Sequence, residues 1–213
     1  MDNYSDLLNF LGNRVTLRKL AQEDRDHERR LRLSKGFHSP TAFPAGVFSH
    51  LVLETARATG VSRRKSEQVQ TYLKRALTGK TICVVGTRYG LLNKVFETFG
   101  AKTYGVDIDP DATSVAKSRR VNIATESAEH LSTVFPGKKP NFIVSFQFFD
   151  PAYWIGREKE LPHVLRGIIQ HSTPQTIHLH QTFGQPTKFE PLQFHSSVEH
   201  SGSIVSRLYS QKR

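Results

Sequence analysis

Residues 81–107 have the sequence TICVVGTRYGLLNKVFETFGAKTYGVD, and this stretch decides the fold. It opens with a short β-branched run that ends at Gly86, which is typical of a buried strand. Residues 91–100 then have helical apolar spacing and stop at Gly100, and residues 102–108 form a second strand-like run. A strand, a helix and a strand in this order predict two parallel strands joined by a helical crossover.

The chain after residue 108 continues the same alternation. Pro110 stands where the first turn of a helix favours proline, so we expect a helix over residues 110–120. Further strands are expected over 121–125, 141–149 and 176–183, a helix over 156–170, and an antiparallel hairpin over 189–210. The pattern predicts an α/β fold with a mostly parallel sheet, helices on both faces and a terminal antiparallel hairpin.

Residues 1–79 are predicted to form a helical N-terminal cap, with a loop at 34–46 that contains two prolines and two glycines. Within the cap, residues 56–62 followed by the basic run 63–65 resemble half of a helix-turn-helix. A basic helix that only covers the core is the other interpretation. In both cases Arg63, Arg64, Lys65, Lys74 and Arg75 could contact phosphates. We therefore divide the chain into a cap over 1–79 and an α/β domain over 80–213.

Composition and charge set further bounds. The 213 residues, 37% hydrophobic and 23% charged, suit a globular protein with one sizeable core. No stretch approaches the roughly 20 apolar residues that cross a bilayer, and the start of the chain lacks the pattern of a signal peptide. With Cys83 as the single cysteine, the sequence predicts a cytoplasmic protein without disulfides. The net charge of +11, of which +7 falls in residues 1–80, favours either an anionic partner or simply solubility.

The glycine loop and a following acid predict a ligand site. Gly86 ends the first strand, and a glycine there lets a ligand approach the backbone closely, next to the start of a helix. Asp107 follows 21 residues later, at the end of the second strand, where a carboxylate can accept hydrogen bonds from both ribose hydroxyls. Together they indicate a site for an adenosine-containing cofactor at the topological switch point. The simpler interpretation is a plain strand–turn–helix with a solvated aspartate.

From residue 80 onward the sequence resembles the class I S-adenosylmethionine-dependent methyltransferases, which have a Rossmann-like fold. Gly86 and Gly90 match the outer two of the family's three loop glycines, and Asp107 matches its ribose-binding acid. The chain departs from the pattern at Val84, where the family often has an acid, and at Arg88, which replaces the middle glycine. The side chain of Arg88 could crowd the cofactor or meet its carboxylate.

The resemblance implies an enzyme that transfers a methyl group from S-adenosylmethionine. It leaves the acceptor open between a small metabolite and a nucleic acid, and the latter would be held through the basic N-terminal region. The alternatives are a non-catalytic nucleic-acid-binding module on the same scaffold and an NAD-dependent oxidoreductase. The cofactor-binding residues that the resemblance implies are Val85, Gly86, Thr87, Arg88, Gly90, Asp107, Ile108, Glu126, Ser127 and Ser145.

The sequence VSFQFFDPAYW (144–154) is the candidate acceptor segment. In one register Ser145 is the strand-end residue and Gln147 points into the pocket. In the other, residues 150–153 resemble the Asp-Pro-Pro-Tyr motif of amino-methylating nucleic-acid methyltransferases, with Asp150 on the target amino group and Tyr153 stacked on the base. The resemblance thus implies Ser145, Asp150 and Tyr153 as catalytic residues. The simpler interpretation is an aspartate that caps the next helix, with aromatic residues covering the core.

Two histidines alternate on the last predicted parallel strand. His178 and His180 are two residues apart, so they share one face of the sheet. A pair of this kind can ligate zinc, but the sequence identifies no third ligand, and we predict no metal site. Buried or solvated histidines are the favoured interpretation.

Overall fold

The computed structural model describes residues 22, 68, 71, 73–146, 148–149, 154–183, 192–200 and 204–211. The predicted cap over residues 1–79 and its basic run 63–65 lie almost wholly outside these residues, so the domain boundary stays a prediction. Residues 73–77 are helical, and Leu73 and Leu77 are fully buried. Gly79 follows at φ 74°, a conformation in which glycine ends a helix without strain.

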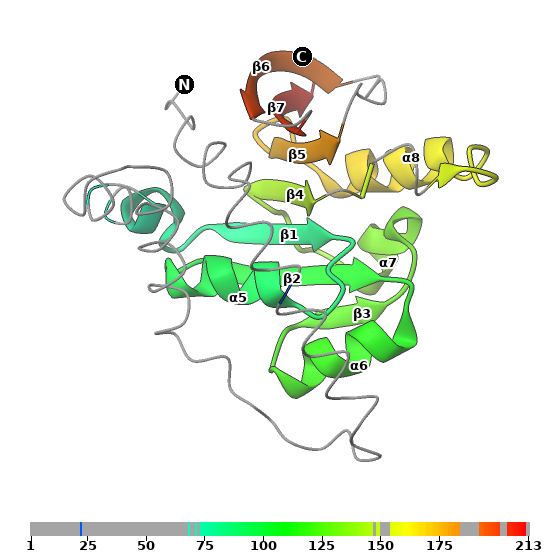
Figure 1. The fold of residues 1–213 in the computed structure, drawn as a ribbon, viewed down its shortest axis with the longest axis horizontal. Coiled ribbons are helices and arrows are strands. Elements are labelled where there is room, and N and C mark those ends of the chain that lie inside the picture. Colours follow the sequence, from blue (N-terminus) through cyan, green and yellow to red (C-terminus); the bar gives the residue numbers. More distant parts are fainter. Residues whose placement is uncertain are drawn as a thin grey trace.

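Within the described residues, strands form one sheet in the order β3-β2-β1-β4-β5-β7-β6 (Figure 1). The first five strands are mutually parallel, which confirms the predicted α/β fold. They are β1 (Thr81–Val85), β2 (Lys102–Asp107), β3 (Ile123–Thr125), β4 (Phe142–Phe146) and β5 (Ile177–Phe183). Beyond them, β7 (Ile204–Gln211) pairs antiparallel with β5, and β6 (Leu192–His200) pairs antiparallel with β7.

Helices cover both faces of the parallel strands. They are α5 (Leu91–Thr98), α6 (Pro110–Ser118), the 3-10 turn η1 (Ala128–His130), α7 (Leu131–Val134) and α8 (Leu161–His171). Because crossovers are right-handed and the strand order reverses between β1 and β4, α5 and α6 lie on one face and α7 and α8 on the other. Leu131 and Ile168 accordingly share one core cluster with the sheet residues Cys83, Tyr104 and Ile143.

The structure differs from the sequence prediction most clearly around β4 and α8 and in two short helices. β4 ends at Phe146 instead of residue 149, because Phe148 and the fully buried Phe149 lie in a turn. The helix predicted from residue 156 begins at Leu161, which places Pro162 in the first turn, where its missing N–H breaks no helical bond. The sequence analysis also missed η1 and α7, since their few residues carry too little helical periodicity to detect.

The reversal of strand order creates a switch point between β1 and β4. In a parallel sheet of this kind, ligands bind outside the carboxyl ends of the strands at such a point. The loops after β1, β2, β3 and β4 therefore delimit the region in which a site is expected. None of the helices in the described part of the chain combines the length and apolarity needed to cross a membrane.

Candidate functional site

The loop after β1 is a tight turn built on left-handed backbone. Gly86 has φ 70° and Gly90 φ 74°, and Gly90 stands at the N-cap of α5 without a side chain to cap the helix. The backbone N–H groups of Gly86 and Thr87 both donate to the carbonyl of Val106, at 3.1 and 3.2 Å. The loop is thus tied to the end of β2, and α5 begins with its first-turn N–H groups at the switch point.

Thr87 is the buried support of this loop. Its side chain is almost fully buried, and its hydroxyl donates to the carbonyl of Val84 at 2.9 Å. The side chain lies against Gly105 on β2, where a Cβ atom would come within 2.2 Å of Thr87 Oγ1. Because Gly105 has no side chain, the side chain of Thr87 can occupy this space and make its hydrogen bond within the loop.

Arg88 adopts the left-handed conformation at φ 49°, in the position where the resemblance expects a glycine. A side chain in this conformation costs on the order of 1 kcal/mol. Its guanidinium carbon lies 5.7 Å from the centre of the Tyr89 ring, in the range of a cation–π contact. Its backbone N–H donates to Asp107 Oδ2 at 2.7 Å. This bond between the loop and the end of β2 is therefore made by the backbone of Arg88 and does not involve its side chain.

Asp107 joins the loops that follow β1 and β2. Besides the bond to Arg88, its Oδ1 accepts from the N–H of Asp109 at 3.0 Å. A carboxylate has about four acceptor positions, so these two bonds leave capacity for further donors. Asp109 in turn caps α6 by accepting from the N–H groups of Asp111 and Ala112. The carboxylate of Asp107 is thus held in place by backbone on both sides.

Ile108 and Glu126 continue the edge from β2 to β3. Ile108 is 55% exposed, which is unusual for a large apolar side chain beside a polar turn. The N–H of Glu126 donates to the carbonyl of Asp107 at 2.9 Å, so Glu126 lies directly beside this turn. The turn after β2 therefore carries the carboxylate of Asp107 and the exposed side chain of Ile108, and Glu126 is bonded to it through the backbone.

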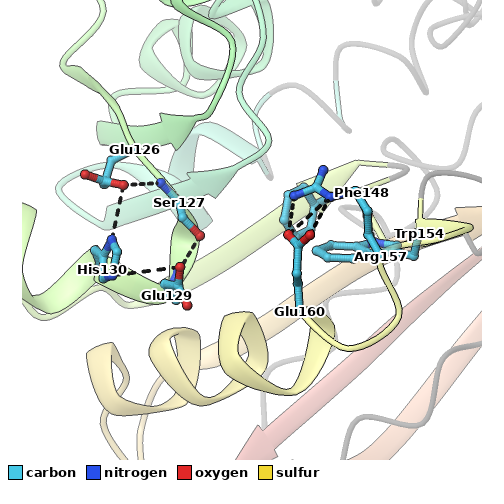
Figure 2. A network of polar contacts seen from close by, with 8 residues as sticks. All are labelled: Glu126, Ser127, Glu129, His130, Phe148, Trp154, Arg157 and Glu160. Carbon is cyan, nitrogen blue, oxygen red and sulfur yellow. Dashed lines mark hydrogen bonds and ion pairs between the residues drawn. The ribbon is translucent and has the colours of Figure 1, made fainter.

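The carboxylate of Glu126 is the centre of a small polar cluster (Figure 2). Its Oε1 accepts from the N–H of Ser127 at 2.8 Å and lies 3.1 Å from His130 Nδ1. These hydrogen bonds, led by the one from Ser127, lower the pKa of Glu126 and keep it ionised and accepting. The hydroxyl of Ser127 accepts from the N–H of Glu129 as the cap of η1. The carboxylate of Glu126 keeps acceptor capacity for an outside donor, since its contacts with Ser127 and His130 both involve Oε1.

Ser145 lies near the carboxyl end of β4, in register with Val85 on β1 and His180 on β5. Its side chain is 1% exposed, and its Oγ lies 2.8 Å from His180 Nδ1. The hydroxyl thus meets a neighbouring strand beneath the site, instead of facing an open pocket. Gln147 and the motif residues 150–153, with Asp150 and Tyr153, lie outside the described residues.

Phe148 is a site residue that the sequence analysis missed. Its ring lies against Gly86, so that a Cβ atom on Gly86 would come within 2.6 Å of Phe148 Cδ2. Its carbonyl accepts from the indole N–H of Trp154 at 2.7 Å, and its ring meets those of Phe149 and Trp154 edge-on. The aromatic richness of residues 146–154 is visible in the sequence, but no local signal places one ring on the β1 loop.

Trp154 and Arg157 close the segment between β4 and α8 (Figure 2). Trp154 is buried, and the guanidinium of Arg157 lies 5.5 Å from the centre of its ring. Arg157 also makes an ion pair with Glu160, through two nitrogens to the same carboxylate. Hydrogen bonding to Glu160 raises the pKa of Arg157, and the pairing lowers that of Glu160.

Three histidines are buried between the sheet and α8. His178 and His180 share one face, as the sequence predicted, with ring centres 5.7 Å apart. His178 Nε2 meets the hydroxyl of Ser172 at 3.1 Å, and His171 Nε2 meets that of Tyr104 at 2.6 Å. Burial lowers the pKa of all three, to about 4 for His171 and about 3 for His178. Among the described residues, no group of three or more metal-ligating side chains is found.

Comparison with known proteins gives a family and a fold. A family model described as a methyltransferase domain matches residues 57–208, which is well over half of the chain. Among curated proteins, no sequence matches.

Three solved structures have a similar fold. A TehB-like SAM-dependent methyltransferase from Corynebacterium glutamicum superposes with a TM-score of 0.53 and 14% identity, over 67% of this chain and 87% of that one. The N-methyltransferase NodS from Bradyrhizobium japonicum superposes with a TM-score of 0.51 and 10% identity, over 70% and 96% of the two chains. A mutant of MtNAS in complex with S-adenosylmethionine has a TM-score of 0.51 and 17% identity, over 78% and 71%.

Proposed function

The chain belongs to the methyltransferase domain family, a class I group that uses S-adenosylmethionine as methyl donor, and from this premise we propose a specific cofactor site. In the proposal, Asp107 binds the ribose, Ile108 packs on the adenine, and Glu126 accepts from the adenine amino group. Gly86 and Gly90 let the methionine part approach the backbone. The reaction proposed is methyl transfer to an acceptor that enters beside the segment between β4 and α8.

The observation that carries the proposal is the carboxylate of Asp107. Two backbone N–H groups hold it, from Arg88 at 2.7 Å and from Asp109 at 3.0 Å, and it keeps capacity for two hydroxyl donors. The exposed side chain of Ile108 and the carboxylate of Glu126, whose pKa is lowered, come next along this edge, and we assign them to the ring face and the amino group of adenine. The donor and acceptor set of this edge therefore fits the cofactor that the family implies.

When bound, S-adenosylmethionine supplies an electrophilic methyl group on a sulfonium. The protein contributes alignment of the acceptor and exclusion of water. We assign the exclusion of water to Phe148, which lies on Gly86, and to Trp154, whose N–H holds the Phe148 carbonyl. Val85 ends β1 below this contact, and Thr87 and Ser127 support the two loops through their hydroxyl groups.

The acceptor side of the proposal keeps Ser145, Asp150 and Tyr153. Ser145 is assigned a positioning role, because its buried hydroxyl bonds to His180 and does not meet an open pocket. Asp150 and Tyr153 are proposed to face the acceptor on the strength of the resemblance. A nucleic acid held through the basic cap residues 63–65 stays a proposed partner, beside a small metabolite as the other acceptor class.

Replacing Asp107 with alanine (Asp107→Ala) is expected to weaken binding of S-adenosylhomocysteine tenfold or more, about 1.4 kcal/mol. The variant loses the ribose acceptor and the link between the β1 loop and α6. Calorimetric titration of the purified full chain measures the effect. Asp111→Ala is the matched control, since it removes an acid from the first turn of α6 without touching the loop. Equal affinity in wild type and Asp107→Ala would remove the ribose assignment.

Replacing Arg88 with glycine (Arg88→Gly) is expected to leave cofactor affinity within about twofold of wild type, since a twofold change is under half a kcal/mol. Its side chain packs on Tyr89, and the bond to Asp107 comes from the backbone, which glycine retains. Glycine also accepts the positive φ of this position without strain. The same titration tests it, and a tenfold loss would show instead that the guanidinium contacts the cofactor.

A further inference from the structure

The edge of the sheet opposite the cofactor site is formed by the segments that lead into the parallel strands. Residues 78–81 lead into β1, 100–103 into β2, 137–142 into β4 and 172–177 into β5. Backbone hydrogen bonds join these segments. The N–H of Lys102 donates to the carbonyl of Lys80 at 2.8 Å, and the N–H of Asn141 donates to the carbonyl of Thr81 at 2.8 Å. The hydroxyl of Thr176 donates to the carbonyl of Pro140 at 2.8 Å. These segments are therefore neighbours in space.

Three of the four segments carry lysines, and none of the four carries an acidic residue. Lys80, Lys102 and Lys139 are exposed, one from each of three adjacent segments. Lys74 and Arg75, also exposed, lie one turn away on the helix over residues 73–77, since the N–H of Thr78 donates to the carbonyl of Lys74. We call Lys74, Arg75, Lys80, Lys102 and Lys139 the amino-edge patch.

The positive charge of the amino-edge patch is not neutralised within the described residues. The ion pairs found there involve Lys94 with Glu97, His130 with its two glutamates, and Arg157 with Glu160, but no member of the patch. Glu97 contacts one of these segments, because its carboxylate accepts a hydrogen bond from the hydroxyl of Thr103. The same carboxylate forms an ion pair with Lys94 at 2.6 Å. Adjacent strands are about 4.8 Å apart, so the three strand-leading lysines start within about 10 Å of one another.

Lys138 lies beside the patch but is held differently. Its ammonium lies 4.8 Å from the Tyr104 ring centre and 4.9 Å from that of Phe135, so it covers the core edge. The charges of Lys139 and Lys138 also help to lower the pKa of His171, after the larger effect of burial. The positive potential of this edge thus reaches the end of α8.

We propose that the amino-edge patch is a docking surface for the phosphate backbone of a nucleic acid. Clustered lysines that have no acidic partner among the described residues repel one another, and a row of phosphates relieves that repulsion while counterions are released. Single lysines recognise phosphate as point charges and need no shaped pocket. The patch contributes to an overall charge of +11, which draws a polyanion toward the protein from a distance.

The docking surface is separate from the cofactor site and does not rest on it. The five residues of β1 lie between Lys80 and Gly86, so the two are about 20 Å apart along an extended strand. A nucleic acid on this edge is therefore anchored away from the transferable methyl. The patch determines where the protein binds along the nucleic acid. The methyl acceptor is then either a distant part of the same nucleic acid, which bends around the sheet to the cofactor site, or a different molecule.

The test measures binding of a fluorescein-labelled, mixed-sequence, 20-nucleotide single-stranded RNA to the full chain by anisotropy, over a range of salt concentrations. The triple variant Lys80→Glu, Lys102→Glu, Lys139→Glu is expected to lose affinity at least tenfold. Three lost phosphate contacts should also reduce the salt slope by about 2, since each contact on a single strand contributes about 0.7. Titration with S-adenosylhomocysteine should remain as in wild type, which shows that the variant is folded.

A second triple variant makes the result specific to position. Lys117→Glu, Lys159→Glu, Arg166→Glu changes the net charge by the same amount at exposed sites on other elements. It is expected to bind the RNA within about threefold of wild type, a difference under 1 kcal/mol. Equal losses in both variants would attribute binding to overall charge and overturn the patch.

Three further outcomes overturn the proposal. In the first, the wild-type chain does not bind the RNA. In the second, polyglutamate or anionic lipid vesicles displace the labelled RNA from the protein at a lower concentration than unlabelled RNA does. Alternatively, Arg63→Glu, Arg64→Glu, Lys65→Glu could abolish binding while the amino-edge variant keeps it, which would place the surface in the cap.

Discussion

Gly105→Ala is expected to lower the free energy of unfolding by about 2 kcal/mol or more and to abolish binding of S-adenosylhomocysteine. A Cβ on Gly105 would lie 2.2 Å from Thr87 Oγ1 and 2.5 Å from the carbonyl of Val84. The second contact is with backbone of the central strand, so rotation of a side chain cannot relieve it. The added methyl therefore has to displace the β1 loop, and with it the backbone that holds Asp107.

The matched control for this variant is Gly137→Ala. Gly137 has φ 72° with no atom within 4 Å of a built Cβ, so the substitution introduces backbone strain without a clash. We expect a loss of about 1 kcal/mol in stability and unchanged affinity for S-adenosylhomocysteine. Denaturant unfolding and calorimetry measure both quantities. If Gly105→Ala is no worse than the control in either measurement, the packing of Thr87 on Gly105 does not support the loop.

Acidification from pH 6.5 to pH 4 is expected to lower the free energy of unfolding by on the order of 3 kcal/mol through His178 alone, and His171 and His180 add to this loss in the same direction. The pKa of His171 is lowered to about 4 and that of His178 to about 3, and that of His180 is lowered well below its ordinary value. In each case burial is the main cause. Below pH 6.5 these histidines become protonated in the unfolded chain but stay neutral in the folded chain until their lowered pKa is reached. The free energy of unfolding therefore falls as the pH falls. Above pH 6.5 both states are neutral at these residues, and their full contribution is present.

Urea unfolding at a series of pH values measures this dependence. The double variant His171→Gln, His178→Gln is expected to be less stable at pH 7, because it alters bonds to Tyr104 and Ser172, but to have a flatter slope between pH 6.5 and 4. His163→Gln, on the exposed face of α8, should keep the wild-type slope. A slope in the double variant as steep as in wild type would locate the acid sensitivity in other groups.

The strands were predictable because each is a short β-branched or apolar run bounded by a turn residue. Gly86 directly follows β1, and Asp107 is the last residue of β2, so both signals are local. The alternation of strands and helices predicted parallel strands, but the order of the strands in the sheet comes from the structure. The end of β4 was placed wrongly because a continuous aromatic run does not show where a strand gives way to a turn. The start of α8 was placed five residues too early.

The contacts of the acceptor segment could not be predicted in the same way. Ser145 was predicted as the strand-end residue and as a catalytic residue, and its hydroxyl forms a hydrogen bond with His180, which is 35 residues away in the chain. Phe148 contacts Gly86 from the other side of the switch point. Both are long-range contacts, and neither residue type marks its partner in the sequence.

The sequence by itself determined the parallel α/β sheet, the cofactor class and the place of Asp107, because periodicity, turn residues and strand-end acids act over a few residues. Only the tertiary structure decided that Thr87 occupies the space left by Gly105 and that Phe148 covers the β1 loop. It alone also gathered Lys80, Lys102 and Lys139 on one edge, since they are far apart in the chain and meet through strand pairing. The physical reason is that packing and surface charge depend on which segments become neighbours, and that follows from the fold as a whole.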